Sequence, residues 1–207
     1  QEQQVHEIDN AYDDFSRCQD IYAEFANQFY TIRSNAADNQ KQIESNLTKT
    51  KRWLEENKLN FRMSDNGRFH DARHYTDVDV KKPDFFMTEK LIKQAKNENW
   101  REYATEVEQL ASEYNIEKAV KRLSQCSKIL ENNGIELPTT KPTFWQKLKG
   151  EYVHSFDTLH DFNDDMSPLL KAKQTDDLKI EQEKNQQARQ AEIDHLRKIE
   201  NDRRDAE

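Results

Sequence analysis

The sequence predicts an all-α protein, an elongated helical bundle with long N- and C-terminal helices and a coiled-coil extension. Glycine occurs three times and proline four times in 207 residues, where average usage would give roughly fourteen and ten. A chain with so few turn-forming residues favours long helices with few connections. Only 34% of the residues are hydrophobic and 35% are charged, which fits narrow apolar stripes on well-solvated helices. The length suits one or two domains.

Residues 1–59 are expected to form one long N-terminal helix. Steps of three and four from Val5 to Leu54 meet an apolar or aromatic side chain at eleven of fifteen positions, which is a helical period. Additional apolar residues widen the stripe in the first half, so this half is expected to contact more than one helix. The stripe becomes polar between Arg33 and Gln42. We expect the helix to continue there, because neither Gly nor Pro intervenes.

Residues 60–83 are predicted to be an irregular polar loop. Asn66-Gly67 is a turn signal, since glycine readily supplies the positive φ that tight turns need. The alternation from Thr76 to Val80 predicts either one short strand or extended chain. Connections of this length are usually functional or mobile.

Residues 84–134 are expected to form a small helical domain. The apolar periods predict helices over Asp84–Asn97, Trp100–Tyr114 and Ile116–Asn132, with a C-terminal cap at Asn133-Gly134. We expect the second and third of these helices to form a helical hairpin.

Residues 135–142 contain two prolines and are predicted to be a linker. A long C-terminal helix is then expected over residues 143–207, with an apolar face between Phe144 and Phe162. The three strongest apolar stretches of the chain are expected to meet in one core: Val5–Phe29, Trp100–Leu130 and Phe144–Phe162.

The C-terminal tail is predicted to be the partner-binding surface. Its large apolar residues are sparse and include Leu178, Ile193, Leu196 and Ile199. Burial of so few side chains cannot offset the entropic cost of ordering the tail. Residues from about 171 onward should therefore be only marginally stable as an isolated helix. They are expected to pair with another chain, or alternatively with the polar second half of the first helix, at Ile43, Leu47 and Leu54. Phe85 and Phe86, directly after Pro83, are a further partner-binding candidate, with a role as core anchors as the alternative.

His70 and His74 have the i, i+4 spacing of metal ligands on a helix, and Asp77 could add an oxygen ligand. The surrounding residues lack an amphipathic period, so we interpret them as surface histidines in a polar loop. A second set, between His154 and Asp165, is interpreted as a solvated acidic face. No metal and no cofactor is therefore expected.

Catalytic motifs are missing from the sequence. It contains no GxSxG, no cysteine with a plausible nearby histidine and no glycine loop for phosphate. A histidine-phosphotransfer domain would need a histidine just before Lys149-Gly150, and none is there. We expect the chain not to be an enzyme.

The net charge of −8 provides no basic surplus for nucleic acid or anionic lipid, and no apolar run is long enough to insert into a membrane. Cys18 and Cys126 are interpreted as small apolar residues on helix faces, and the cytoplasm is favoured as the location. The chain begins at Gln1 without an initiator Met, so a processed product or a fragment is expected.

The function predicted from these features is a non-enzymatic protein–protein interaction module, such as an adaptor, scaffold or assembly subunit, that binds a protein partner or itself through helices. Two alternatives are a metal-dependent enzyme or metal sensor that uses His70 and His74, and the soluble part of a membrane-anchored protein.

Overall fold

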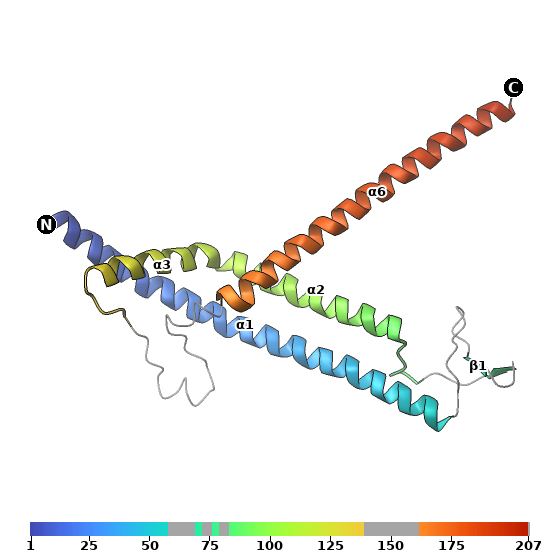
Figure 1. Cartoon of the computed structure of the whole chain (residues 1–207), viewed down its shortest axis with the longest axis horizontal. Helices are drawn as coiled ribbons and strands as arrows, with labels where there is room; N and C mark the ends of the chain where they lie inside the picture. Colours follow the sequence, from blue (N-terminus) through green and yellow to red (C-terminus); the bar gives the residue numbers. More distant parts are fainter. Residues whose placement is uncertain (58–68, 72–75, 79–82, 139–161, 207) are drawn as a thin grey trace.

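The computed structural model describes residues 1–57, 69–71, 76–78, 83–138 and 162–206. The helices in these ranges are α1 (Glu2–Glu56), α2 (Glu89–Glu113), α3 (Ile116–Asn132) and α6 (Ser167–Asp205), with a turn of π-helix, η2 (Phe162–Met166), directly before α6. Two short antiparallel strands, β1 (Phe69–Asp71) and β2 (Thr76–Val78), accompany them. The predicted all-α bundle with long N- and C-terminal helices is confirmed (Figure 1).

Helix α1 continues through its polar middle without a break, as predicted. Asn99 on α2 donates from Nδ2 to the Ala36 carbonyl oxygen at 3.0 Å, so α2 contacts α1 even where the apolar stripe is weak. The stripe is buried from Phe15 to Phe29, whereas Val5 is 57% exposed. The apolar period therefore predicts the helix correctly but overestimates burial at its first turns.

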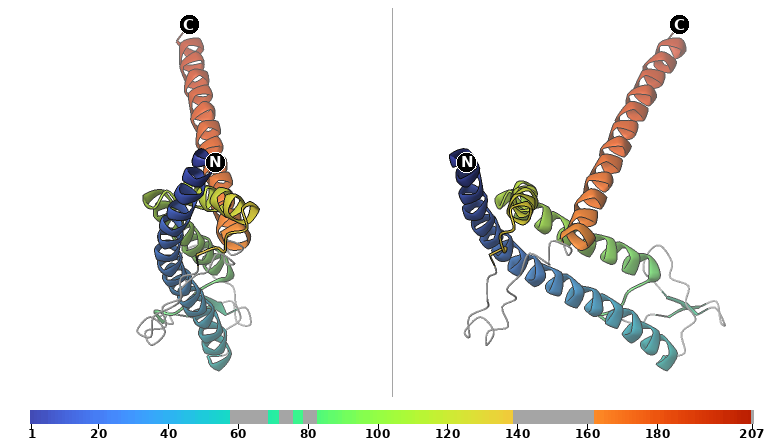
Figure 2. Two further views of the ribbon diagram at one scale, coloured as in Figure 1. Left: turned by 90° about the vertical axis from the view of Figure 1, so that its left-hand side faces the viewer. Right: turned by 60° about the vertical axis from the view of Figure 1, so that its left-hand side comes forward.

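Helices α2 and α3 run one after the other along α1, antiparallel to it (Figures 1 and 2). Contacts at intervals fix this register: Met87 with Thr50, Lys96 with Glu44, Asn99 with Ala36, Tyr114 with Gln28, Arg122 with Asp14 and Asn133 with Gln4. Both helices pack mainly on α1 and make few contacts with each other. The predicted hairpin between them is therefore wrong, because α1 supplies the apolar surface that both need.

The junction between α2 and α3 depends on Asn115, whose φ is +48°. Asn tolerates this left-handed conformation better than most residues, and it redirects the chain from one helix to the next. Helix α2 is itself continuous across residues 97–100, where two separate helices were predicted. It begins at Glu89, after the Thr88 side chain, which accepts a hydrogen bond from the Leu91 N–H at 3.1 Å, and not at Asp84 as predicted.

The cap predicted at the end of α3 is confirmed. Gly134 has a φ of +69°, a conformation that costs a glycine nothing. Its N–H donates to the Glu131 carbonyl oxygen at 3.0 Å, and the Ile135 N–H donates to the Leu130 carbonyl oxygen at 3.0 Å. These bonds satisfy carbonyl groups that the helix end leaves without partners.

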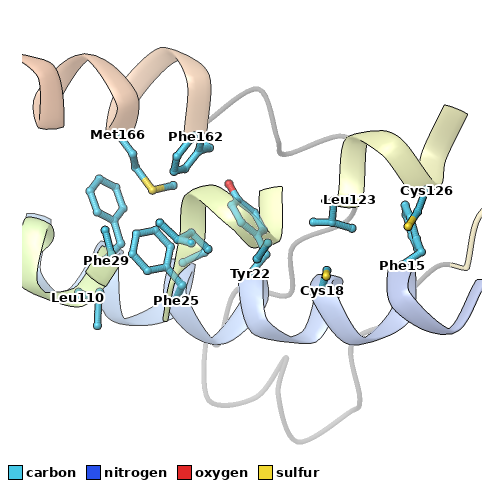
Figure 3. Close-up of a cluster of buried hydrophobic side chains, with 14 of the residues drawn as sticks. Phe15, Cys18, Tyr22, Phe25, Phe29, Leu110, Leu123, Cys126, Phe162 and Met166 are labelled. Carbon is cyan, nitrogen blue, oxygen red and sulfur yellow. The ribbon is translucent and has the colours of Figure 1, made fainter. Parts of the chain in front are cut away.

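One hydrophobic core joins α1, α2, α3, η2 and the start of α6 (Figure 3). Phe25 and Phe29 stack with ring centroids 6.3 Å apart. The predicted convergence is confirmed for the first two apolar stretches and for Phe162 of the third. Cys18 and Cys126 are buried free thiols in this core, as interpreted from the sequence.

Several predictions lie outside the described residues. They include the Asn66-Gly67 turn, the second half of the 135–142 linker, and the helix predicted over residues 143–161. Within the predicted 60–83 loop, β2 confirms a short strand at Thr76–Val78, and β1 adds a second strand that was not expected.

Candidate functional site

The base of α6 is held in the core by apolar side chains. Phe162 and Met166 come from η2 and lie over Phe25 and Phe29 of α1 (Figure 3). Leu170, one turn further along, is 7% exposed. Phe162 and Met166 thus cover part of the wide apolar stripe in the first half of α1, which the sequence predicted would contact more than one helix. Leu170 lies beside Ala111 of α2 and Ile116 of α3.

Ion pairs surround this apolar contact. Arg33 Nη1 on α1 donates to Asp165 Oδ2 at 3.1 Å, and Arg101 Nε on α2 donates to Asp176 Oδ2 at 3.0 Å. Each pair is partly exposed, so each contributes little to stability by itself. Together they fix the direction in which α6 leaves the bundle.

Lys173 is the last buried residue of α6, at 8% exposure. Its Nζ lies 2.6 Å from Asp177 Oδ2 on the next turn and 3.9 Å from Glu108 Oε1 on α2. Burial thus extends along α6 to Lys173, and ion pairs with the bundle extend to Asp176, the partner of Arg101. The predicted boundary at about residue 171 is therefore too early, because Lys173 is still buried. That the residues beyond it are marginal alone stays a prediction.

Helix α6 leaves the bundle as a single extended helix (Figures 1 and 2). We call residues 178–206 the arm. Every residue from 181 to 206 is exposed. The arm does not pair with the second half of α1, which packs instead with α2 through contacts such as Lys96 with Glu44 at 3.0 Å. Of the two pairings predicted for the tail, the intramolecular one is therefore not formed.

Four large apolar side chains of the arm share one face. Leu178 is 58% exposed, Ile193 44%, Leu196 58% and Ile199 51%. At about 100° per residue, Leu178 and Leu196 lie in line five turns apart, and Ile193 and Ile199 lie about 60° to either side. We call this set the apolar arm face. It contains all four tail residues predicted from the sequence to bind a partner.

The arm is electrically balanced. Residues 178–206 contain seven basic and seven acidic side chains, although the whole chain has a net charge of −8. Some opposite charges pair along the helix, as Arg204 Nη2 does with Glu200 Oε1 at 2.7 Å. The arm is therefore neither an acidic nor a basic attachment site.

The other predicted partner residues, Phe85 and Phe86, are half-buried beside α1. The Phe86 ring lies edge-on to Trp53 with centroids 6.0 Å apart. The Thr50 hydroxyl lies 3.2 Å from the Phe85 carbonyl oxygen. These contacts tie the segment before α2 to α1, and an open hollow of about 530 Å³ beside Met87 adjoins them. Whether a partner also uses these two residues stays a prediction.

His70 lies in β1, with its Cα opposite that of Asp77 in β2, and His74 lies outside the described residues. A strand does not place residues i and i+4 on a helix face, so the spacing argument for a metal site does not apply to His70. In the part of the chain that the structure describes, no three His, Cys, Asp or Glu side chains are grouped to hold a metal ion. Most of the second histidine–aspartate set, residues 154–161, lies outside that part.

The two thiols are poorly suited to nucleophilic chemistry. Burial raises the pKa of Cys18 above its ordinary value, and burial does the same to the pKa of Cys126, although the neighbouring Arg122 lowers it in part. The reactive thiolate is therefore disfavoured at neutral pH.

Sequence reasoning missed the residues that anchor the arm, above all Arg33, Glu108 and Lys173. Arg33 was visible as a charged interruption of the apolar stripe, and Lys173 with Asp177 as an i, i+4 pair of opposite charge. Neither signal identifies the distant partner, because the Arg33–Asp165 pair joins residues 132 positions apart.

None of the helices among the described residues has an apolar stretch long enough to cross a lipid bilayer. Comparisons with protein-family models, with curated proteins and with solved structures find no match to this chain.

Proposed function

We propose that this protein is a non-enzymatic interaction module in which the bundle holds out the arm to bind a helical protein partner. The observation that carries the proposal is the apolar arm face, four large apolar side chains aligned on a helix in which every residue from 181 to 206 is exposed. Adaptor, scaffold and assembly subunit are the roles that fit such a surface.

The physical argument begins with the arm as a solitary helix. A helix gains most of its stability in a protein from packing an apolar face, and no described residue packs against the arm beyond its base. Single exposed leucines are common on protein surfaces, but four large apolar residues on one face offer a helical partner a seam to cover. The anchored base supports this role, because it fixes the position of the arm before a partner binds and so lowers the entropic cost of binding.

A photo-crosslinking amino acid placed at single arm positions tests the proposal. We expect crosslinks to protein from Ile193, on the apolar arm face, in the native host. Gln187 is the matched control, since it lies directly opposite Leu178 and Leu196 at about 180°. It should crosslink weakly or not at all.

Equal crosslinking from positions 193 and 187 would show that the apolar arm face has no special role. Crosslinking from neither position, under conditions in which the labelled chain is folded and expressed, would likewise reject the arm as the binding surface.

A further inference from the structure

We propose that the partner of the arm is the arm of a second copy of this chain, paired in antiparallel orientation about a point near Gln187. This inference rests on the proposed function and names the occupant of the apolar arm face. It follows from the order of apolar and charged residues along that face, from the charge balance of the arm and from the direction of its base.

The seam of the arm is the line of residues that a straight partner helix would meet at alternating steps of four and three. It consists of Leu178, Gln182, Asn185, Arg189, Glu192, Leu196 and Ile199. Its strongly apolar members lie at the two ends and its polar members in the middle. An antiparallel pair centred on residue 187 places Leu178 of each copy opposite Leu196 of the other, so that leucines meet at both ends of the contact.

Charge decides between the two orientations. A parallel pair would set Arg189 against Arg189 and Glu192 against Glu192, which places like charges in contact within the seam. The antiparallel pair sets Arg189 opposite Asn185, and Glu192 opposite Gln182. Each charged side chain then faces a polar amide that can hydrogen-bond to it.

The flanks of the antiparallel pair are also compatible. Glu181 of one copy lies beside His195 of the other, whose ring N–H can donate a hydrogen bond to the carboxylate. Ala188 lies beside its own counterpart at the centre, where a small side chain lets the two helices approach closely.

The charge balance of the arm favours a copy of itself over a strongly charged partner. With seven basic and seven acidic residues, two arms feel no net repulsion, and a highly acidic or basic helix would gain no net attraction. The acidic excess of the chain lies outside the arm. In a dimer the negatively charged bundles would therefore repel each other, while the neutral arms form the contact.

The base of α6 leaves the apolar arm face open to a second copy. Leu170 and Lys173, which face the bundle, lie about 80° and 140° around the helix from Leu178. The end of a second arm can therefore run alongside the base without displacing its contacts. Because the apolar arm face has only four large apolar side chains per copy and a polar middle, the dimer should dissociate on dilution.

The first experiment is sedimentation equilibrium of the full chain from low micromolar to millimolar concentration. We expect the mass to rise from monomer to dimer. Leu196→Glu should raise the dissociation constant at least tenfold, whereas Gln187→Glu should leave it nearly unchanged. Both variants add one negative charge to an exposed helical position, so the main difference between them is the face of the helix that they alter.

The second experiment measures orientation with spin labels. Asn201→Cys and Gln187→Cys place labels away from the seam, and the buried Cys18 and Cys126 should not react. In the antiparallel dimer the labels at position 201 are about 42 Å apart along the helix axis, while in a parallel dimer they lie about 10–20 Å apart. Labels at position 187 lie at the centre of the contact, on the outer side of each helix, so their separation should be nearly the same in either orientation, which makes them the control for dimer formation.

The outcomes separate this inference from the proposed function. A concentration-dependent dimer with a long distance at position 201 supports it. A short distance between the labels at position 201 overturns the antiparallel pairing. A dimer that Leu196→Glu does not weaken shows that the apolar arm face is not the contact surface. A chain that stays monomeric throughout overturns self-association, while crosslinking from Ile193 to a different protein would leave the proposed function standing.

Discussion

Arg33 and Asp165, 132 positions apart in the chain, form an ion pair of 3.1 Å between the middle of α1 and the turn that precedes α6. The pair sits beside the apolar contact that Phe162 and Met166 make with α1. Both of its side chains are about half exposed, so water screens their attraction. The apolar contact should therefore hold the base of α6, and the ion pair should mainly set its direction.

Replacing Met166 should destabilise the bundle far more than replacing Arg33. Met166 is fully buried, and Met166→Ala should lower the free energy of unfolding by about 2–4 kcal/mol through lost burial and the cavity left behind. Arg33→Ala should lower it by less than about 1 kcal/mol. Urea denaturation of the two variants measures both effects. Equal losses would show that the ion pair stabilises the base as much as the apolar contact does, which would contradict this account.

Lys173 should contribute to the stability of the bundle through its charge as well as through its buried aliphatic stem. Its side chain is 10% exposed, but the carboxylates of Asp177 and Glu108 are 50% and 43% exposed, which weakens the pairing. Lys173→Met retains most of the stem and should cost about 1–2 kcal/mol of unfolding free energy. The exposed Lys171→Met is the control and should be neutral. If Lys173→Met proves neutral too, the charge does not fasten α6 to α2.

Thr50 should be sensitive to loss of its hydroxyl group. Its Oγ1 donates to the Asn46 carbonyl oxygen at 2.8 Å and accepts from the Met87 N–H at 3.0 Å, and the residue is 1% exposed. Thr50→Val keeps the shape but leaves the Met87 N–H without this partner, which should cost about 1–3 kcal/mol. Thr48→Val, on an exposed part of the same helix, should change the urea midpoint little. Thr50→Ser should recover most of the loss, and a failure to do so would assign the effect to packing.

The buried thiols should make the bundle less stable at alkaline pH. Burial raises the pKa of Cys18 and that of Cys126 in the folded state, so unfolded thiols ionise first as the pH rises. The unfolded state then binds fewer protons, and stability falls from about pH 8.5 upward, through the raised folded-state pKa values. Below that range the thiols are protonated in both states and their contribution is complete.

The urea midpoint between pH 7 and pH 10 measures this effect. Its decline should be steeper in the natural chain than in the Cys18→Ala/Cys126→Ala double variant, which controls for other titrating groups. Parallel curves for the two proteins would mean that the thiols ionise equally in both states. The same burial predicts slow reaction with a thiol reagent until urea unfolds the chain.

Residues whose environment is set along their own helix were the ones that the sequence predicted well. The spacing of Phe15, Tyr22 and Phe29 predicts the buried face of α1, and the lack of Gly and Pro predicts its continuity past Arg33. Gly134 marks the end of α3, because few other residues adopt its positive φ without strain. The exposure of the tail residues from Leu178 to Ile199 could be predicted, because these apolar side chains are too sparse to form a core of their own.

Features that depend on distant partners were predicted poorly. The apolar stripes of α2 and α3 show that each needs a partner surface, but not that α1 provides it for both, so a hairpin was expected instead. The continuous α2 across Asn97–Trp100 shows packing overriding a weak local period. The anchoring role of Lys173 was missed because it depends on the contact of α6 with another helix, α2.

The central claim is that the arm binds a partner and does not stabilise the bundle. Truncating the chain after Asp177 tests it most directly. At a concentration where the full chain is monomeric, the truncated protein should keep its urea midpoint, with an unfolding free energy within about 0.5 kcal/mol of the full chain. At higher concentration it should remain monomeric while the full chain dimerises. A truncated protein that unfolds, or that associates as the full chain does, would contradict the account.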